Sequence, residues 1–429
     1  MLTSPHYSVV VVGGGQAGLA LSYYLSKCGI DHIVYEKRTA MHTWRTERWD
    51  NFCLVTPNWQ CRLPDHNYQG SDPHGFMKKD EILRYLDEFK TKVHAPIREG
   101  VAVQRVAPRS QGGFDVKTNM GDCTASQVVV ASGGYHVPII PRMAERLPRN
   151  LLQLHSAQYR SADALPEGNV LVVGSGQSGA QIAEDLHLAG RKLVLAVGDA
   201  PRCARFYRGR DVVDWLAEMG YYEMPVQDHP LREGVRDNTN HYVTGRDGGR
   251  DIDLRRFALE GMQLYGRLVD ANDKKLTFAP TLTAALDHAD EVYNGINASI
   301  DKHIAANGID APHGEPYVPV WTPAAERTEL DLAQSGISTV IWCIGFSPDF
   351  SWLDAPVFNG RGHPLHQRGV TQQGGLYFLG LPWLHTWGSG RFSGVACDAL
   401  YLAERIAARR ELFASSPSSG VRESEQLLA

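Results

Sequence analysis

The sequence contains no Cys-x-x-Cys pair, no long apolar run and no large excess of charge of one sign. Its 7 cysteines are an odd number and widely scattered, which argues against structural disulfides, a zinc ribbon and a dithiol redox centre. A formal net charge of -5 over 429 residues gives no electrostatic reason to expect nucleic acid or an anionic membrane as a partner. These absences favour a protein that acts on a small molecule.

The N-terminal region also lacks the features of a targeting segment. Its apolar run is short, three consecutive glycines at 13–15 interrupt it, and no basic segment precedes it. We therefore expect a cytoplasmic protein with no membrane partner. At the other end, residues 413–429 are rich in Ser, with Pro and Gly, and we expect a flexible tail there.

A Gly-x-Gly-x-x-Gly fingerprint near the start of the chain consists of Gly13, Gly15 and Gly18. It follows the apolar run VVVV and precedes a helical pattern, and the next strand pattern, HIVYEKR, contains Glu36. A carboxylate at this place can bind the hydroxyls of an adenosine ribose, while the glycines let the backbone approach a pyrophosphate. We predict FAD here, and the alternative is a glycine turn that binds nothing. Further expected contacts are Gln16, Ala17 and Lys37.

A second fingerprint, VLVVGSGQSGAQIAED, lies in the middle of the chain. It also joins a strand pattern to a helical pattern and contains Gly174, Gly176, Gln177, Ser178 and Gly179. We expect these residues to hold the pyrophosphate of a second dinucleotide. Two different dinucleotides in one chain indicate a redox protein.

The two fingerprints differ at the end of the following strand. RKLVLAV carries no acid, and Arg202 and Arg205 come soon after it. Because a guanidinium can bind a ribose 2'-phosphate, we expect these two arginines to select NADPH. Asp199 weighs against this interpretation, and a solvated basic loop is the alternative.

The pattern predicts an α/β fold with two nested Rossmann-like dinucleotide-binding domains, for FAD and NADPH, and a helical insertion in the second. We expect the FAD-binding domain at 1–159 and again at 336–412, with the NADPH-binding domain at 160–335. Apolar residues recur at helical spacing through 281–304, which marks the insertion. It would cap the flavin cavity, form a homodimer contact, or simply pack on the NADPH-binding domain.

Three further segments carry a family resemblance. VVVASGGYHVPIIP, which contains Ser132 and Gly133, resembles the linker that leaves the flavin domain of two-dinucleotide flavoproteins, and TVIWCIGF resembles the returning linker. The segment from Gly375 onward resembles the one that closes over the flavin ring. The chain to about residue 410 resembles class B flavin-dependent monooxygenases, including YUCCA-type indole-3-pyruvate monooxygenases and bacterial CzcO-like flavoproteins.

The resemblance implies several flavin contacts in HTWRTERWDNFCLVTPNWQCRLP. Trp44 and Arg45 would contact the pyrophosphate or ring region, and Thr56 to Gln60 would line the ring. Asn58 is the expected catalytic residue, because its side chain would hold a flavin oxygen adduct. Core packing is the alternative for Trp44.

The family signature expected before the second fingerprint is only partly present. RNLLQLHSAQY keeps His155 and Tyr159 but has Arg149 and Leu151 where Phe and Gly belong. His155 would position the NADPH-binding domain or serve a purely structural role.

By this resemblance the protein is an NADPH- and O2-dependent flavin monooxygenase that oxidises a small organic substrate through a C4a-(hydro)peroxyflavin, with nitrogen as one candidate site of oxidation. No protein nucleophile or metal is required. One alternative is an NADPH-dependent flavin reductase or oxidase that passes electrons to a quinone or protein acceptor. Another is a catalytically idle, redox-sensing flavoprotein.

Overall fold

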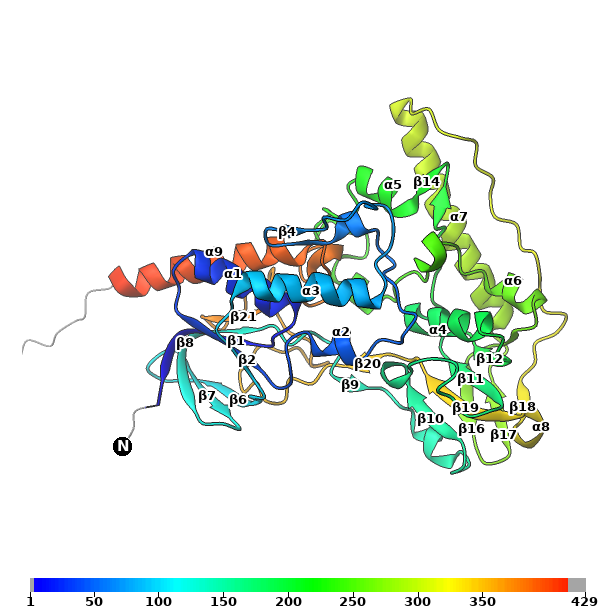
Figure 1. The fold of residues 1–429 in the computed structure, drawn as a ribbon, viewed down its shortest axis with the longest axis horizontal. Helices are drawn as coiled ribbons and strands as arrows, with labels where there is room; N and C mark the ends of the chain where they lie inside the picture. The colour runs from blue at the N-terminus through cyan, green and yellow to red at the C-terminus, as the bar shows by residue number, and fades with distance from the viewer. Residues whose placement is uncertain (1–3, 416–429) are drawn as a thin grey trace, which may run out of the picture.

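The computed structural model describes residues 4–415, and the chain forms two bodies, each built around its own main sheet (Figure 1). The first sheet has seven strands in the order β5-β2-β1-β8-β7-β6, with β21 paired to β8. These strands are β1 (His6–Val12), β2 (His32–Glu36), β5 (Ile97–Glu99), β6 (Val103–Pro108), β7 (Phe114–Thr118), β8 (Cys123–Val130) and β21 (Leu376–Phe378).

The centre of this sheet is parallel and apolar on both faces. β1 pairs in parallel with β2 on one side and with β8 on the other. Val9, Val10 and Val11 are fully buried, which is typical of a parallel strand covered on both faces. The helices α1 (Gln16–Lys27) and α9 (Val395–Ser415) share an apolar cluster against the sheet. The chain therefore returns to its first body at its C-terminal end.

One short helix and two short strands beside the sheet, together with the helix α3 (Lys79–Val93), complete the first body. The amphipathic helix α3 contributes Ile82, Leu86 and Phe89 to the same cluster as α1. The others are α2 (His42–Thr46), β3 (Arg62–Leu63) and β4 (His66–Asn67).

The second sheet is parallel throughout, in the order β10-β19-β11-β12-β15. Its strands are β10 (Leu152–His155), β11 (Asn169–Val173), β12 (Leu193–Ala196), β15 (Gln263–Tyr265) and β19 (Ile337–Trp342). The helix α4 (Gln177–Leu188) follows β11 and packs with it. Our expected division assigned β10 and β19 to the FAD-binding parts, but both pair in the second sheet. The sequence of such a short strand does not show which sheet it joins, because that depends on the strand with which it pairs.

Two linkers join the bodies. They contain β9 (Val137–Pro138) and β20 (Phe346–Ser347), which pair antiparallel with each other. In Figure 1 both lie between the two sheets. The two crossings are thus held side by side.

The expected helical insertion is present as α7 (Leu282–Asn307), which projects from the second body (Figure 1). Its first turns join the apolar cluster of the second sheet through Leu282 and Leu286. Its far half packs in a separate cluster with Trp215 of α5 (Val212–Glu218). The other elements of this region are β13 (Phe206–Tyr207), β14 (Arg210–Asp211), α6 (Leu254–Leu259), β16 (Leu268–Ala271), β17 (Lys275–Phe278), β18 (Glu329–Asp331) and α8 (Leu332–Ser335).

The tail expected at 413–429 lies mostly outside the described residues, which end at Ser415, the last residue of α9. Residues 413–415 belong to that helix. Within residues 4–415, no helix combines the length and apolar character needed to cross a bilayer.

Candidate dinucleotide site

The first glycine loop joins β1 to α1, and close packing requires two of the three fingerprint glycines. Gly13 has φ of +115°, and an added Cβ would lie 2.6 Å from the carbonyl oxygen of Ala131. A Cβ on Gly18 would lie 1.9 Å from the carbonyl oxygen of Gly13. By contrast, a Cβ on Gly15 would meet nothing within 4 Å. The loop therefore has open space in front of the N-terminus of α1, where backbone N–H groups favour an anion.

Glu36 reaches the same loop from the end of β2. Its carboxylate accepts hydrogen bonds from the backbone N–H groups of Gly14 (2.7 Å) and Arg38 (2.8 Å). Ala17 is buried behind the loop, where a Cβ on Gly380 would approach it to 2.7 Å, whereas Lys37 is exposed. The carboxylate is thus fixed beside the open space, and the lysine is not.

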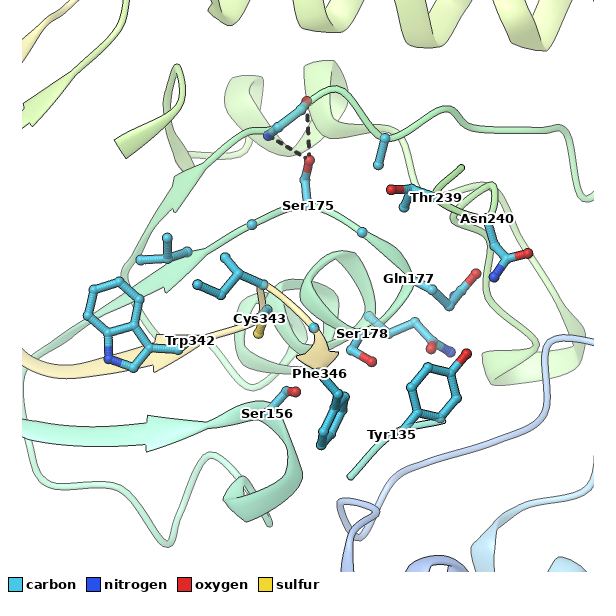
Figure 2. Close-up of a pocket in the computed structure, with 18 of the residues that line it drawn as sticks. Tyr135, Ser156, Ser175, Gln177, Ser178, Thr239, Asn240, Trp342, Cys343 and Phe346 are labelled. Carbon is cyan, nitrogen blue, oxygen red and sulfur yellow. Dashed lines mark hydrogen bonds between the residues drawn. The ribbon is translucent and has the colours of Figure 1, made fainter. Parts of the chain in front are cut away.

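The second glycine loop repeats this geometry between β11 and α4. Gly174 has φ of +98°, and an added Cβ would lie 2.7 Å from the carbonyl oxygen of Cys343. A Cβ on Gly179 would lie 1.9 Å from the carbonyl oxygen of Gly174. In place of an acid, Ser175 bonds through its hydroxyl to the backbone of Gly198, as the dashed lines in Figure 2 show.

A cavity of about 940 Å³ lies in front of the second loop and extends to the first body. Gly174, Gly176, Gln177 and Ser178 line it from the second body. In Figure 2, Gln177, Thr239 and Asn240 lie to one side of it, and Trp342 lies on the other. Further lining residues come from the first body and the linkers: Arg48, Trp49, Phe52, Tyr135, Phe346, Trp383 and Arg391. The cavity can hold an extended ligand that reaches from one body to the other.

Comparison with known proteins gives the family. A family model described as pyridine nucleotide-disulphide oxidoreductase matches residues 10–216. An uncharacterized CzcO-like oxidoreductase of Geobacillus kaustophilus is 32% identical over 404 residues, covering 93% of this chain and 97% of the relative. This chain belongs to the CzcO-like branch of the class B flavin monooxygenase family.

Other family members are similar over part or all of the chain. The probable indole-3-pyruvate monooxygenase YUCCA1 of Arabidopsis thaliana is 30% identical over 192 residues, covering 43% of this chain and 46% of the relative. Among solved structures, a flavin-containing monooxygenase from Stenotrophomonas maltophilia gives a TM-score of 0.63 at 20% identity and covers 95% of this chain and 99% of that one. The second likeness shows that the fold is shared.

Trp44 of this family member lies at the first glycine loop. Its indole N–H donates to the side-chain oxygen of Gln16 (3.1 Å), and its ring stacks on Phe392 at 5.1 Å. The Gln16 amide N–H in turn reaches the carbonyl of Gly390 at 3.5 Å. Helix α2, which carries Trp44, is thereby tied to both α1 and the C-terminal segment.

Arg45 does not line the cavity, and its contact with the flavin stays a prediction. Its guanidinium forms an ion pair with Asp87 on α3. Arg48, three residues later, lines the cavity and lies over the rings of Trp44 (5.0 Å) and Phe52 (5.4 Å). The helical turn of α2 directs the first arginine outward, and this could not be read from the sequence alone.

Asn58 has both polar atoms of its side chain hydrogen-bonded within its own loop, and its catalytic role stays a prediction. It is 3% exposed; its amide N–H donates to the carbonyl of Asp72 (2.9 Å), and its oxygen accepts from the backbone N–H of Met77 (2.7 Å). It is absent from the lining of the cavity. The geometry therefore supports a structural role that stabilises residues 57–77.

Gln60 and Ser132, unlike Asn58, have buried polar side-chain atoms without hydrogen-bond partners. Gln60 is 1% exposed, and neither its side-chain nitrogen nor its oxygen has a hydrogen-bond partner. The buried hydroxyl of Ser132 has none either, and Gly133 beside it has φ of +77° with open space at its Cβ position. Thr56 is half-buried nearby in sequence. Buried polar atoms without partners are rare, and these mark places where a ligand can bind.

Arg202 and Arg205 are both buried and both form ion pairs with acids, and neither lines the cavity. Arg202 is 2% exposed and forms an ion pair with Asp290 of α7 at 2.7 Å. Arg205 is 1% exposed and pairs with Asp211. Arg202 is thereby held against the insertion helix α7, and Arg205 against the start of α5. The tertiary fold instead brings Arg267, which follows β15, to the cavity.

His155 is completely buried at the start of the second body. Its Nε2 lies 3.0 Å from the carbonyl of Gly345 on the returning linker, and burial lowers its pKa. The Tyr159 hydroxyl donates to Asp185 of α4 at 2.6 Å. These contacts favour the structural alternative for His155.

Proposed function

We propose that the protein is an NADPH- and O2-dependent FAD monooxygenase that oxidises a small organic substrate. The observation that carries the proposal is that two glycine loops, each at a helix N-terminus, belong to the two bodies that enclose one cavity. Flavin accepts a hydride from NADPH and, once reduced, activates O2.

The residues of the first body fit FAD. Gly15 leaves room for a pyrophosphate at the N-terminus of α1, and Glu36 stands where it can accept hydrogen bonds from a ribose. Gln60 and Ser132 offer buried polar atoms that lack partners within the protein. A bound flavin would supply those partners, which removes the free-energy cost of leaving the atoms unsatisfied.

The residues of the second body fit NADPH. The loop at Gly176 to Ser178 would hold its pyrophosphate. Arg267 lines the cavity and is 64% exposed, with Asp199 at 3.6 Å. We propose Arg267 as the group that binds the 2'-phosphate, in exchange for this exposed and weak ion pair.

The cavity walls would protect the reaction from water. Trp49 and Trp383 are 5% exposed, and Phe52 packs against both major apolar clusters. An apolar enclosure limits the decay of activated oxygen into hydrogen peroxide. Nitrogen remains a candidate site of oxidation, because one structure of the same fold is titled an ornithine N-hydroxylase of Kutzneria, with reduced FAD and NADP+ (TM-score 0.61, 15% identity). A cytoplasmic location and a homodimer stay predictions.

The experiment is to purify the protein with FAD, supply NADPH in air, and measure NADPH oxidation, hydrogen peroxide and products from a panel of amines, sulfides, ketones and carboxylic acids. Incorporation of isotopically labelled O2 into a product supports the proposal. Rapid NADPH oxidation with peroxide alone, accelerated by a quinone, would instead assign a reductase. Failure of NADPH to reduce the flavin would indicate an idle flavoprotein.

A further inference from the structure

A guanidinium without an acidic partner lies at the end of the cavity nearest the first body. Arg391 lines the cavity from the C-terminal segment, directly after Gly390, whose carbonyl faces Gln16 of the first loop. Its guanidinium stacks on Trp387 at 3.8 Å and donates to the carbonyl of that residue and to the side-chain oxygen of Asn240 (2.9 Å). Within the described side chains, no carboxylate forms an ion pair with it.

Arg391 is half-buried, and this partial loss of water is unfavourable for a charge without an acidic partner. Desolvation lowers the pKa of Arg391, and the charged or titratable groups that influence it are the phenols of Tyr135, Tyr221 and Tyr222. A cation removed from water without a counter-ion is unfavourable by itself. A ligand that carries negative charge would offset that cost.

Arg48 strengthens the positive character of this end. It also lines the cavity, and its guanidinium donates a hydrogen bond to the backbone carbonyl of Glu47. Tyr135, which lines the cavity together with Arg48 and Arg391, affects the pKa of both guanidiniums. Two cations thus line the same cavity.

Each acid of the cavity lining forms an ion pair with another arginine, although the Glu47 carboxylate also raises the pKa of Arg48. Glu47 pairs with Arg38 at 3.2 Å. Asp237 pairs with Arg361 at 3.5 Å, and Asp199 pairs with the cavity arginine at the opposite, ribose end. The inner end of the cavity is therefore electropositive, while its walls are aromatic: Phe52, Tyr135, Phe346 and Trp383.

We propose that Arg391 binds the carboxylate of the substrate, so that the substrates are small carboxylic acids with a planar apolar body. This inference rests on the proposed function, since it places the acid between the FAD-binding and NADPH-binding loops. A planar guanidinium, held flat on Trp387, presents paired N–H donors that match a carboxylate. The same charge would repel protonated amines from this end of the cavity.

The test measures binding, not turnover, on the FAD-loaded protein with NADP+ present. Phenylacetate and its neutral counterpart phenylacetamide are titrated while the flavin absorbance is recorded. We expect the native protein to prefer the acid by about 10-fold or more, because hydrogen bonds to a partly buried charge contribute strongly to affinity. In Arg391→Gln the acid should lose about 10-fold or more in affinity, the amide should change less than about 2-fold, and Arg391→Lys should restore part of the preference.

Arg105→Gln is the matched control, since it removes one positive charge at an exposed ion pair with Asp354 in the first body, away from the cavity lining. It should leave both affinities unchanged. Equal weakening of acid and amide in Arg391→Gln would overturn the proposal and indicate packing. Competition between phenylacetate and NADP+ would overturn it by assigning Arg391 to the nucleotide.

A changed flavin reduction potential in Arg391→Gln, with the preference for the acid intact, would also overturn the proposal and assign the arginine to the charge of the reduced flavin. Failure of the proposed function has a different signature. In that case NADPH oxidation yields peroxide without an oxygenated product, whereas the acid can still bind in preference to its amide. The two proposals can therefore fail separately.

Discussion

The two glycine loops are nearly the same object built twice, and they differ at one contact. In each loop a Cβ on the first fingerprint glycine would collide with a backbone carbonyl just after a neighbouring strand. A Cβ on the last fingerprint glycine would collide with the carbonyl oxygen of the first. In the first loop, Glu36 bonds to the backbone of Gly14. In the second, the hydroxyl of Ser175 bonds to the backbone of Gly198 in place of such a carboxylate. The shared part lets a dinucleotide backbone approach, and the differing part bears on which dinucleotide it is.

The contact with Glu36 also explains why the first loop has Gly14 where the second has Ser175. A Cβ on Gly14 would lie 2.9 Å from the Cβ of Glu36 and 2.7 Å from a methyl group of Ile97, so glycine is needed there. Opposite Ser175 stands a glycine, which leaves room for its side chain. An acid at the end of the strand, such as Glu36, therefore requires glycine at the position of Gly14 in the loop.

The largest expected effect comes from adding one methyl group to either loop. Gly18→Ala should abolish FAD binding, and Gly179→Ala should keep FAD but slow its reduction by NADPH more than about 100-fold, because each Cβ would collide with a carbonyl oxygen. Flavin content and the rate of flavin reduction measure the two results. Loss of FAD in Gly179→Ala would show that the loops are not functionally separate.

The next effect concerns the arginine at the ribose end of the second loop. Arg267→Gln should lower the NADPH to NADH ratio of kcat/KM by about 10- to 100-fold, since a charge-assisted hydrogen bond to phosphate contributes about 1.5 to 3 kcal/mol. Arg202→Gln is the control and should leave the ratio unchanged, although it breaks the buried pair with Asp290 and lowers stability. The reverse result would restore the expectation drawn from sequence.

A smaller effect is expected at the acid of the first loop. Glu36→Gln should weaken FAD binding by about 10-fold, because a neutral amide accepts weaker hydrogen bonds from ribose hydroxyls than a carboxylate does. Titration of the FAD-free protein with FAD measures this. Asp199→Asn, the corresponding change at the other cavity end, should leave FAD affinity intact. An equal loss in both variants would contradict the division between the loops.

The smallest expected effect is on the pH dependence of stability, and it comes from His366 in the first body. Burial, together with Arg236, lowers the pKa of His366 in the first body to about 4. In the unfolded chain its pKa is near 6.5. Protonation therefore lowers the free energy of unfolding as the pH falls from 6.5 toward 4, and the loss is about 1 kcal/mol at pH 5.5. His366→Gln should reduce this pH dependence in denaturant unfolding. An unchanged slope between pH 7 and 5.5 would show that His366 does not contribute.

Local pattern was enough to predict the glycine loops and the long insertion helix. Glycines next to a buried strand and a helix have few other structural interpretations, and the apolar period through 281–304 matches α7. The family resemblance also pointed correctly to the CzcO-like branch. These features depend on contacts between residues close in sequence.

The side chains that line the cavity were harder to predict. Arg45, Asn58, Arg202 and Arg205 have the right chemistry, yet their partners are Asp87, the loop at 72–77, Asp290 and Asp211. Each such choice depends on residues that the fold brings close from elsewhere. A pattern that records type and spacing contains no information about those partners.

The sequence by itself determined that the chain folds two strand–glycine–helix units, because close backbone packing at Gly13, Gly18, Gly174 and Gly179 tolerates no side chain. Only the tertiary structure decided which cations face the cavity. Arg267 and Arg391 lie far from either fingerprint in the chain and meet there because β15 and the C-terminal segment return to it. Charge acts through space, and spatial neighbours are set by the fold.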